Sequence, residues 1–339
     1  MILLLWIPFP AFAEELTAPE PPSDTSELMP YEDMSFGEGL WHIVTNAFGL
    51  IYPNLRSCII ICFGVIGIAV IVSILQEFSG KTGKTIELAG TVAAACMLFS
   101  PTHTLIREAA DTVRSLSEYG KLLLPVMTAA LAAQGGGGTA TALYVGTALF
   151  DSVLASMISN LLIPMVYMLL AISVSKAAIR TAPLEGLQKL LSDGTAKGLR
   201  IALYIITGYL TVSGVVGGAA DQISVKAAKL TISGMVPVVG SIMADASETI
   251  LVSASVVKNA IGVYGLWSVV AIGIGPFLNV GVQYLTLKIT QSLCLLFSGK
   301  AVSELVGNFA SAMGLLLAMT GTMSLLMLIS TICFMKGMG

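Results

Sequence analysis

The sequence predicts an all-α, polytopic transmembrane protein with about six spans, two re-entrant hairpins and internal repeats of about 110 residues. Of its 339 residues, 55% are hydrophobic and only 11% are charged, and the mean hydropathy is +0.88. A soluble domain carries about 25% charged residues. Residues 57–75 contain no charge at all, and a helix of roughly 20 apolar residues is long enough to cross a bilayer.

Residues 1–13 are predicted to be a signal peptide. This apolar run is too short to span a bilayer, and it ends in Ala11-Phe12-Ala13, which offers the small residues that a signal peptidase recognises. The basic residues that usually precede such a run are missing. An uncleaved anchor is therefore the alternative interpretation.

Residues 14–38 are predicted to be an acidic, disordered extracytoplasmic segment, because they are rich in Pro and acids and hold too few apolar residues to form a core. No Lys or Arg precedes Arg56, which favours the outer side of the membrane. The polytopic transmembrane domain then covers residues 39–339. It begins with a predicted interfacial helix at 39–54, where aromatic and polar residues mix.

Six apolar stretches are predicted to span the membrane: 54–76, 86–105, 154–175, 199–217, 264–287 and 313–335. With the N-terminus outside, the loops at 77–85, 176–198 and 288–312 lie inside. These loops hold most of the lysines that follow the first span. Cytoplasmic loops are enriched in Lys and Arg, so the lysine distribution favours this orientation.

Two stretches, 122–150 and 233–262, fit no simple span and are predicted to be re-entrant hairpins entering from the outer face. In each, two short apolar arms flank a break rich in Gly or Pro. Irregular backbone at membrane depth requires cover by protein or by a water-filled cavity. A pair of short spans is the alternative in the first case. The residues that mark the hairpins are Pro125, Gly135, Gly136, Gly137, Gly138, Gly234, Pro237 and Gly240.

Recurring prolines, lysines and short strings indicate a parallel internal repeat. Pro53, Pro164 and Pro276 are 111 and 112 residues apart, and a lysine follows twelve residues after each of the last two. Residues 87–90 (Glu-Leu-Ala-Gly) also parallel residues 304–307 (Glu-Leu-Val-Gly). We therefore predict roughly three copies of one helical unit of about 110 residues, an organisation common in transporters.

Asp151 is the candidate for a polar path, since an acid within an apolar stretch is costly and usually faces protein or water. The favoured interpretation is a solvated residue near the interface, with the polar path as the alternative. Cys58 and Cys62 are predicted to be small buried hydrophobes rather than metal ligands. Zinc-protease and nucleotide-loop motifs are absent from the sequence, as are basic clusters. We expect no enzyme activity, no cofactor, no metal and no nucleic-acid partner.

The segment from Ile232 to Gly240, Ile-Ser-Gly-Met-Val-Pro-Val-Val-Gly, followed by Asp245, resembles the signature of the stage III sporulation protein AE family. The signal sequence, acidic segment and polytopic remainder resemble that family over nearly the whole chain. The resemblance implies a subunit of the channel or "feeding tube" complex between mother cell and forespore, required for endospore development after engulfment. It implies a multi-pass protein in the mother-cell-derived outer forespore membrane. The implied partners are ring-forming subunits and a cytoplasmic ATPase subunit.

A self-contained secondary transporter is the second hypothesis. Its substrate site would lie at the interface between repeats, as it does in many transporters built from repeated units.

Overall fold

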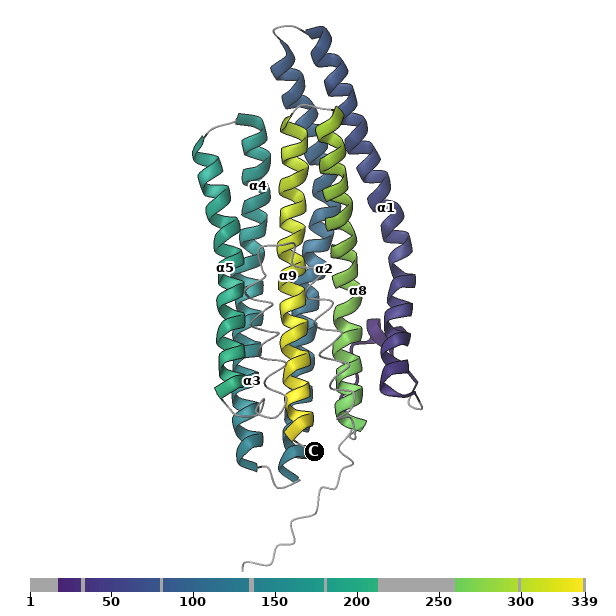
Figure 1. The fold of residues 1–339 in the computed structure, drawn as a ribbon, viewed down its shortest axis with the longest axis vertical. Coiled ribbons are helices and arrows are strands. Elements are labelled where there is room, and N and C mark those ends of the chain that lie inside the picture. Colours follow the sequence, from purple (N-terminus) through teal and green to yellow (C-terminus); the bar gives the residue numbers. More distant parts are fainter. Residues whose placement is uncertain are drawn as a thin grey trace, which may run out of the picture.

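The structure is a computed structural model that describes residues 18–31, 34–79, 82–133, 137–179, 182–212, 260–297 and 300–337. Every regular element in these ranges is helical, which confirms the predicted all-α class (Figure 1). The elements in chain order are η1 (Ser23–Leu28), α1 (Phe36–Ser79), α2 (Gly83–Ala133), α3 (Gly137–Met157), η3 (Ile158–Leu162), α4 (Ile163–Ile179), α5 (Ala182–Val212), α8 (Ala260–Phe297) and α9 (Lys300–Gly337).

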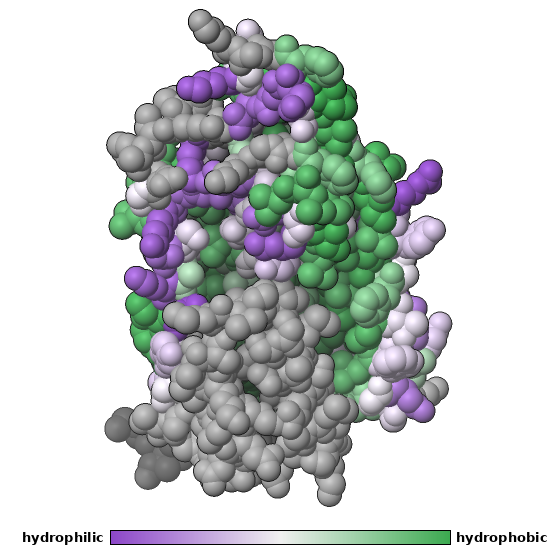
Figure 2. Space-filling model, turned by 45° about the horizontal axis from the view of Figure 1, so that its top comes forward, coloured by the Kyte–Doolittle hydropathy of each residue, from purple (hydrophilic) through white to green (hydrophobic). Residues whose placement is uncertain are grey.

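The helices form one elongated bundle in which α1–α2, α4–α5 and α8–α9 are three antiparallel hairpins (Figure 1). All three hairpins turn at the same end of the bundle, whereas the C-terminus lies at the opposite end. The predicted inner loops therefore share one end, as the lysine distribution indicated. Figure 2 shows hydrophilic side chains gathered near this end and a broad hydrophobic area beside them.

Five described segments are long and apolar enough to cross a bilayer: Phe36–Phe78, Gly83–Ala132, Leu143–Lys176, Ile261–Phe297 and Ala301–Met335. They contain five of the six predicted spans. The other predicted span, 199–217, begins in α5 and continues outside the described residues. The five segments fit a membrane protein, and the total number of spans stays a prediction.

Helix α9 forms the centre of the bundle. It packs against α8, α2, α4, α3 and α5, and it is the most deeply buried of the five membrane-crossing segments. Its fully buried side chains include Phe309, Met313, Leu316, Met323 and Phe334. Helix α1 is much less buried than α9, and large apolar residues such as Phe63 and Phe78 are exposed along its outer side.

The first predicted hairpin does not have short arms. Residues 122–133 are the end of the 51-residue helix α2, and residues 137–150 are the start of α3. The sequence suggested short arms because Pro125 and the glycine run interrupt the apolar pattern, yet α2 continues through Pro125. The second predicted hairpin, 233–262, lies outside the described residues except for its last three, which open α8.

The segment that precedes α1 differs from the predicted disordered tether. Residues 18–31 lie against the bundle, and Thr25 and Leu28 of η1 are buried. Ser35 and Glu38 then form a capping box, with Ser35 Oγ 2.7 Å from Glu38 Oε2, and start α1. The predicted interfacial helix 39–54 is the first part of α1 and continues through Pro53 into the span.

The three prolines of the predicted repeat lie in the three helices that run toward the shared turns, namely α1, α4 and α8 (Figure 1). Pro164 follows the π-helical turn η3. Proline cannot donate to the carbonyl four residues earlier, and such widened turns accommodate the lost bond. The proline positions agree with the repeat, which itself remains a prediction.

The predicted repeat aligns Gly90 with Gly307. Each of these glycines allows the two helices of a hairpin to approach closely. A Cβ on Gly90 of α2 would overlap Val72 Cγ2 of α1, and a Cβ on Gly307 of α9 would overlap the Gln291 amide of α8. Small residues at such contacts are the usual means of close helix packing in membranes. The matched sequence strings thus have the same structural role in the two hairpins.

We predict that Gly90→Ala destabilises the protein. Val72 is β-branched and has one preferred rotamer in a helix, so it cannot move aside, and overpacking of this kind costs about 1–3 kcal/mol. Thermal unfolding in a fixed detergent measures the effect as a lower Tm. Gly67→Ala is the matched control in α1, because nothing lies within 4 Å of its Cβ position. Equal Tm values for the two variants would contradict this packing.

Orientation is tested with single cysteines in a variant that lacks the five native cysteines. Glu118 and Lys189 are both exposed. Glu118 lies in the half of α2 away from the α1–α2 turn, whereas Lys189 lies near the start of α5, close to the α4–α5 turn. The basic end of the bundle, where the three hairpins turn, is predicted to face the cytoplasm. An impermeant thiol reagent should therefore label Glu118→Cys in intact cells and Lys189→Cys only after permeabilisation. The reverse pattern would invert the topology.

Candidate functional site

Asp151 lies in α3 and is buried, with 3% of its surface exposed. Its Oδ2 accepts a hydrogen bond from Ser117 Oγ of α2 at 2.8 Å. Among the described residues, its Oδ1 is buried and has no hydrogen-bond partner. Within the described part of the chain, one carboxylate oxygen of Asp151 therefore has a hydrogen-bond donor and the other has none.

The carboxyl group of Asp151 lies where α2 and α3 come close to α9. A Cβ placed on Gly120 of α2 would be 3.6 Å from Asp151 Oδ2 and 2.8 Å from Met327 Cε of α9. Burial of an ionised carboxylate in such surroundings is costly, so the position of Asp151 depends on the polar partners that α2 provides.

This burial shows that the favoured interpretation of Asp151 as a solvated interfacial residue is wrong. The sequence contained the relevant signal, an acid within an apolar stretch. It could not show which face of α3 meets α2, because that depends on how the two consecutive helices pack against each other and against α9. The polar-path alternative remains a hypothesis.

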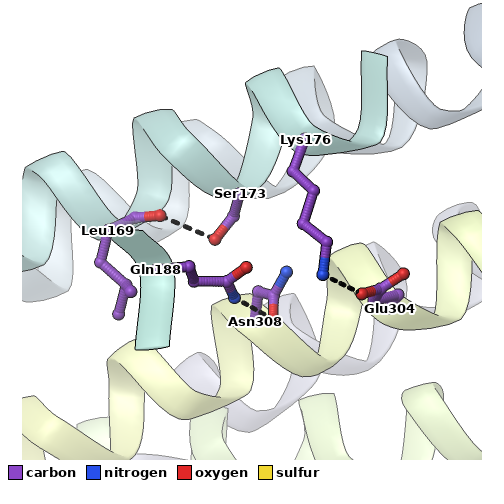
Figure 3. Close-up of polar contacts among 6 residues, drawn as sticks. All are labelled: Leu169, Ser173, Lys176, Gln188, Glu304 and Asn308. Carbon is purple, nitrogen blue, oxygen red and sulfur yellow. Dashed lines mark hydrogen bonds and ion pairs between the residues drawn. The ribbon is translucent and has the colours of Figure 1, made fainter. Parts of the chain in front are cut away.

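A second polar cluster joins the end of α4 to the starts of α5 and α9, near the hairpin turns. Figure 3 shows its side chains. Lys176 of α4 forms an ion pair with Glu304 of α9. Gln188 Nε2 of α5 donates to Asn308 Oδ1, one turn further along α9, at 2.6 Å. The Lys176 side chain is mostly buried, whereas the Glu304 side chain is about half exposed.

This α4–α5–α9 cluster fixes the second hairpin to the central helix. The ion pair is partly open to solvent, and such pairs contribute roughly 0–1 kcal/mol. Each side-chain amide has one donor end and one acceptor end, so the Gln188–Asn308 hydrogen bond requires a defined orientation of both groups. The sequence pattern singled out Lys176 as a repeat marker and an inner-loop lysine, and Glu304 as a repeat marker. It did not single out Gln188 and Asn308, since polar residues near loops are common.

The predicted hairpin residues do not come together as one site in the described structure. Pro125 lies within α2, whereas Gly137 and Gly138 open α3. Gly135, Gly136, Gly234, Pro237 and Gly240 lie outside the described residues. Cys58 and Cys62 are free and buried, as predicted. In the described ranges, no group of three or more His, Cys, Asp and Glu side chains is arranged to hold a metal ion.

Comparison with known proteins gives one family and one curated relative. The family model for stage III sporulation protein AE matches residues 29–339. The stage III sporulation protein AE of Bacillus subtilis (strain 168) is 23% identical over 178 residues, which are 52% of this chain and 45% of the relative. The match thus spans about half the length of that relative. No solved structure matches.

We predict that Ser117→Ala destabilises the protein by about 1–3 kcal/mol, because it leaves Asp151 Oδ2 buried without its donor. Ser173→Ala is the control, since this buried hydroxyl donates only to the Leu169 carbonyl of its own helix. Thermal unfolding of both variants in one detergent makes the comparison. In an Asp151→Leu background, Ser117→Ala should have little further effect. An unchanged effect there would mean that the two side chains are not coupled.

We also expect Asp151→Asn to accumulate normally and to unfold at the wild-type temperature or above it. The amide oxygen still accepts from Ser117, and the variant carries no charge that burial would penalise. Normal accumulation with complete loss of biological function would instead support the polar path.

Proposed function

The chain belongs to the stage III sporulation protein AE family, and we propose that it is a non-enzymatic membrane subunit of a channel complex that links mother cell and forespore. The match of the family model over residues 29–339 carries this proposal. The proposed location is the mother-cell-derived outer forespore membrane. There the subunit would support endospore development after engulfment.

The packing of the bundle favours a structural subunit over a complete transporter. In the described residues, side chains of α9 fill the centre of the bundle, and those of Phe309, Met313 and Leu316 are fully buried there. A conduit within the complex would then lie between subunits or between copies of the chain. That the complex transports material is also part of the proposal, and this part is supported by the family membership.

The outer side of the bundle has surface available for lipid or for other membrane subunits. Large apolar residues are exposed on α1, for example Ile60, Phe63 and Phe78. The proposed partners are other stage III sporulation membrane proteins, ring-forming subunits outside the membrane and a cytoplasmic ATPase subunit at the basic end. The sequence has no nucleotide-binding loop, so ATP-driven work would come from such a partner.

Deletion of the gene tests the proposed role. We expect normal vegetative growth and an arrest of spore development after engulfment, restored by the wild-type chain expressed in the mother cell. Expression of the chain only in the forespore should not restore development, and it controls for location. Normal spores from the deletion strain would refute a sporulation role.

Reconstitution separates the subunit from the self-contained transporter. The gently solubilised protein should co-purify with other sporulation membrane proteins. Alone in liposomes, it should not accumulate substrate against a gradient, because its partners are missing. Accumulation by the purified chain alone would favour the transporter hypothesis.

A further inference from the structure

One face of α8 carries a polar residue at nearly every turn within its membrane-crossing part. Successive members of this polar stripe are four, three and four residues apart, namely Asn279, Gln283, Thr286 and Thr290. At this spacing their side chains leave the helix on the same side. The proposed function makes no use of the stripe.

Helix α1 faces the polar stripe with polar residues of its own, which are one turn apart: Asn54, Cys58 and Cys62. Asn54 Nδ2 donates to Asn279 Oδ1 at 2.9 Å. The thiols of Cys58 and Cys62 lie within hydrogen-bonding reach of the hydroxyl groups of Thr286 and Thr290, respectively. The two sets of residues thus form a polar seam between α1 and α8.

Gln283 is buried in this seam without a hydrogen-bond partner. Only 1% of its surface is exposed, and within the described part of the chain neither Nε2 nor Oε1 has a partner. Its neighbours on the stripe, Asn279 and Thr286, both meet α1, so Gln283 lies on the α1 side as well. A buried amide without partners is costly, and such groups in native proteins are almost always paired with protein or with ordered water.

The surroundings of the Gln283 amide suit water. Helices α1 and α8 both run toward the shared turns (Figure 1), and Cys58 and Gln283 follow the hydrogen-bonded pair Asn54 and Asn279 by four residues each. One helical turn therefore brings Cys58 and Gln283 to the same level. An amide, a thiol and the Thr286 hydroxyl meet there, and a buried water needs two to four polar partners of this kind. A charged ligand would find no counter-charge, because residues 57–76 and 260–287 contain no charged side chain.

A route for water leads to this level from a pocket of about 560 Å³ between η1, α1, α2 and α8. Asp24 and Asp111 line the pocket and are exposed, so it is open to solvent. On α8 its lining extends as far as Asn279. Gln283 is one turn beyond Asn279 on the same face, so the pocket ends where the buried part of the seam begins.

We propose that the seam between α1 and α8 binds water, with the Gln283 amide and the Cys58 thiol as the site and Asn279 at its entrance from the pocket. Helix α1 then meets the rest of the bundle through a hydrated contact, whereas apolar side chains such as Phe309 and Leu316 fill the surroundings of α9. Small polar solutes that follow the water reach Cys58 within the membrane-crossing segment. This inference is independent of the sporulation role.

Two native cysteines provide the test, which uses the full chain in lipid nanodiscs. One variant retains only Cys58 and another only Cys96, with the other native cysteines replaced by alanine. Cys96 is exposed on α2 within the charge-free stretch 88–106, so lipid surrounds it in a bilayer. Methanethiosulfonate ethylammonium reacts with thiols in water, and it should modify the buried Cys58 faster than the exposed Cys96. Faster modification of Cys96, or no modification of Cys58, would overturn the proposal.

Gln283→Met keeps the length of the side chain and removes the amide. It should slow the modification of Cys58 about tenfold, because the water loses its hydrogen bonds to the amide. Ser324→Ala is the matched control, since this buried hydroxyl of α9 also has no partner among the described residues but lies against Gly273. Thermal unfolding checks that both variants fold. If Cys58 reacts equally fast in the two folded variants, Gln283 is not the water site and the proposal fails.

Discussion

The burial of α9 by the surrounding helices is the constraint on which the rest of the structure depends. Within a membrane, apolar helices gain little by leaving lipid for each other, so close van der Waals packing must hold them together. Helix α9 contacts five other helices, and glycines such as Gly307 allow the close approach. Enlarging Gly307 would push α8 and α9 apart while leaving each helix intact.

The same packing determines which polar groups can be tolerated inside the bundle. Asp151 reaches its donor Ser117 only because α2 and α3 lie side by side, and Gln188 reaches Asn308 only because α5 lies beside α9. Buried polar groups without hydrogen-bond partners destabilise the fold, whereas those with partners favour a single arrangement of the helices. They therefore fix the relative position of helices that apolar contacts alone would leave free to slide.

Family membership and geometry together describe a membrane protein with a filled centre and an apolar periphery. The side chains of α9 fill the middle of the described bundle, whereas α1 has exposed apolar residues along its length. The pocket between η1, α1, α2 and α8 also lies away from α9. In the proposed function, contact with lipid and partners would then occur around this filled centre.

The sequence alone determined the all-α class, five of the membrane-crossing segments, the shared basic end and the family resemblance. These features follow from local hydropathy and charge, which can be read along the sequence without knowing the tertiary contacts. Tertiary structure decided the rest: that α2 continues through Pro125, that η1 packs on the bundle, and that Asp151 is buried. The burial of η1 and of Asp151 depends on how helices pack against one another, and a linear pattern does not specify that packing.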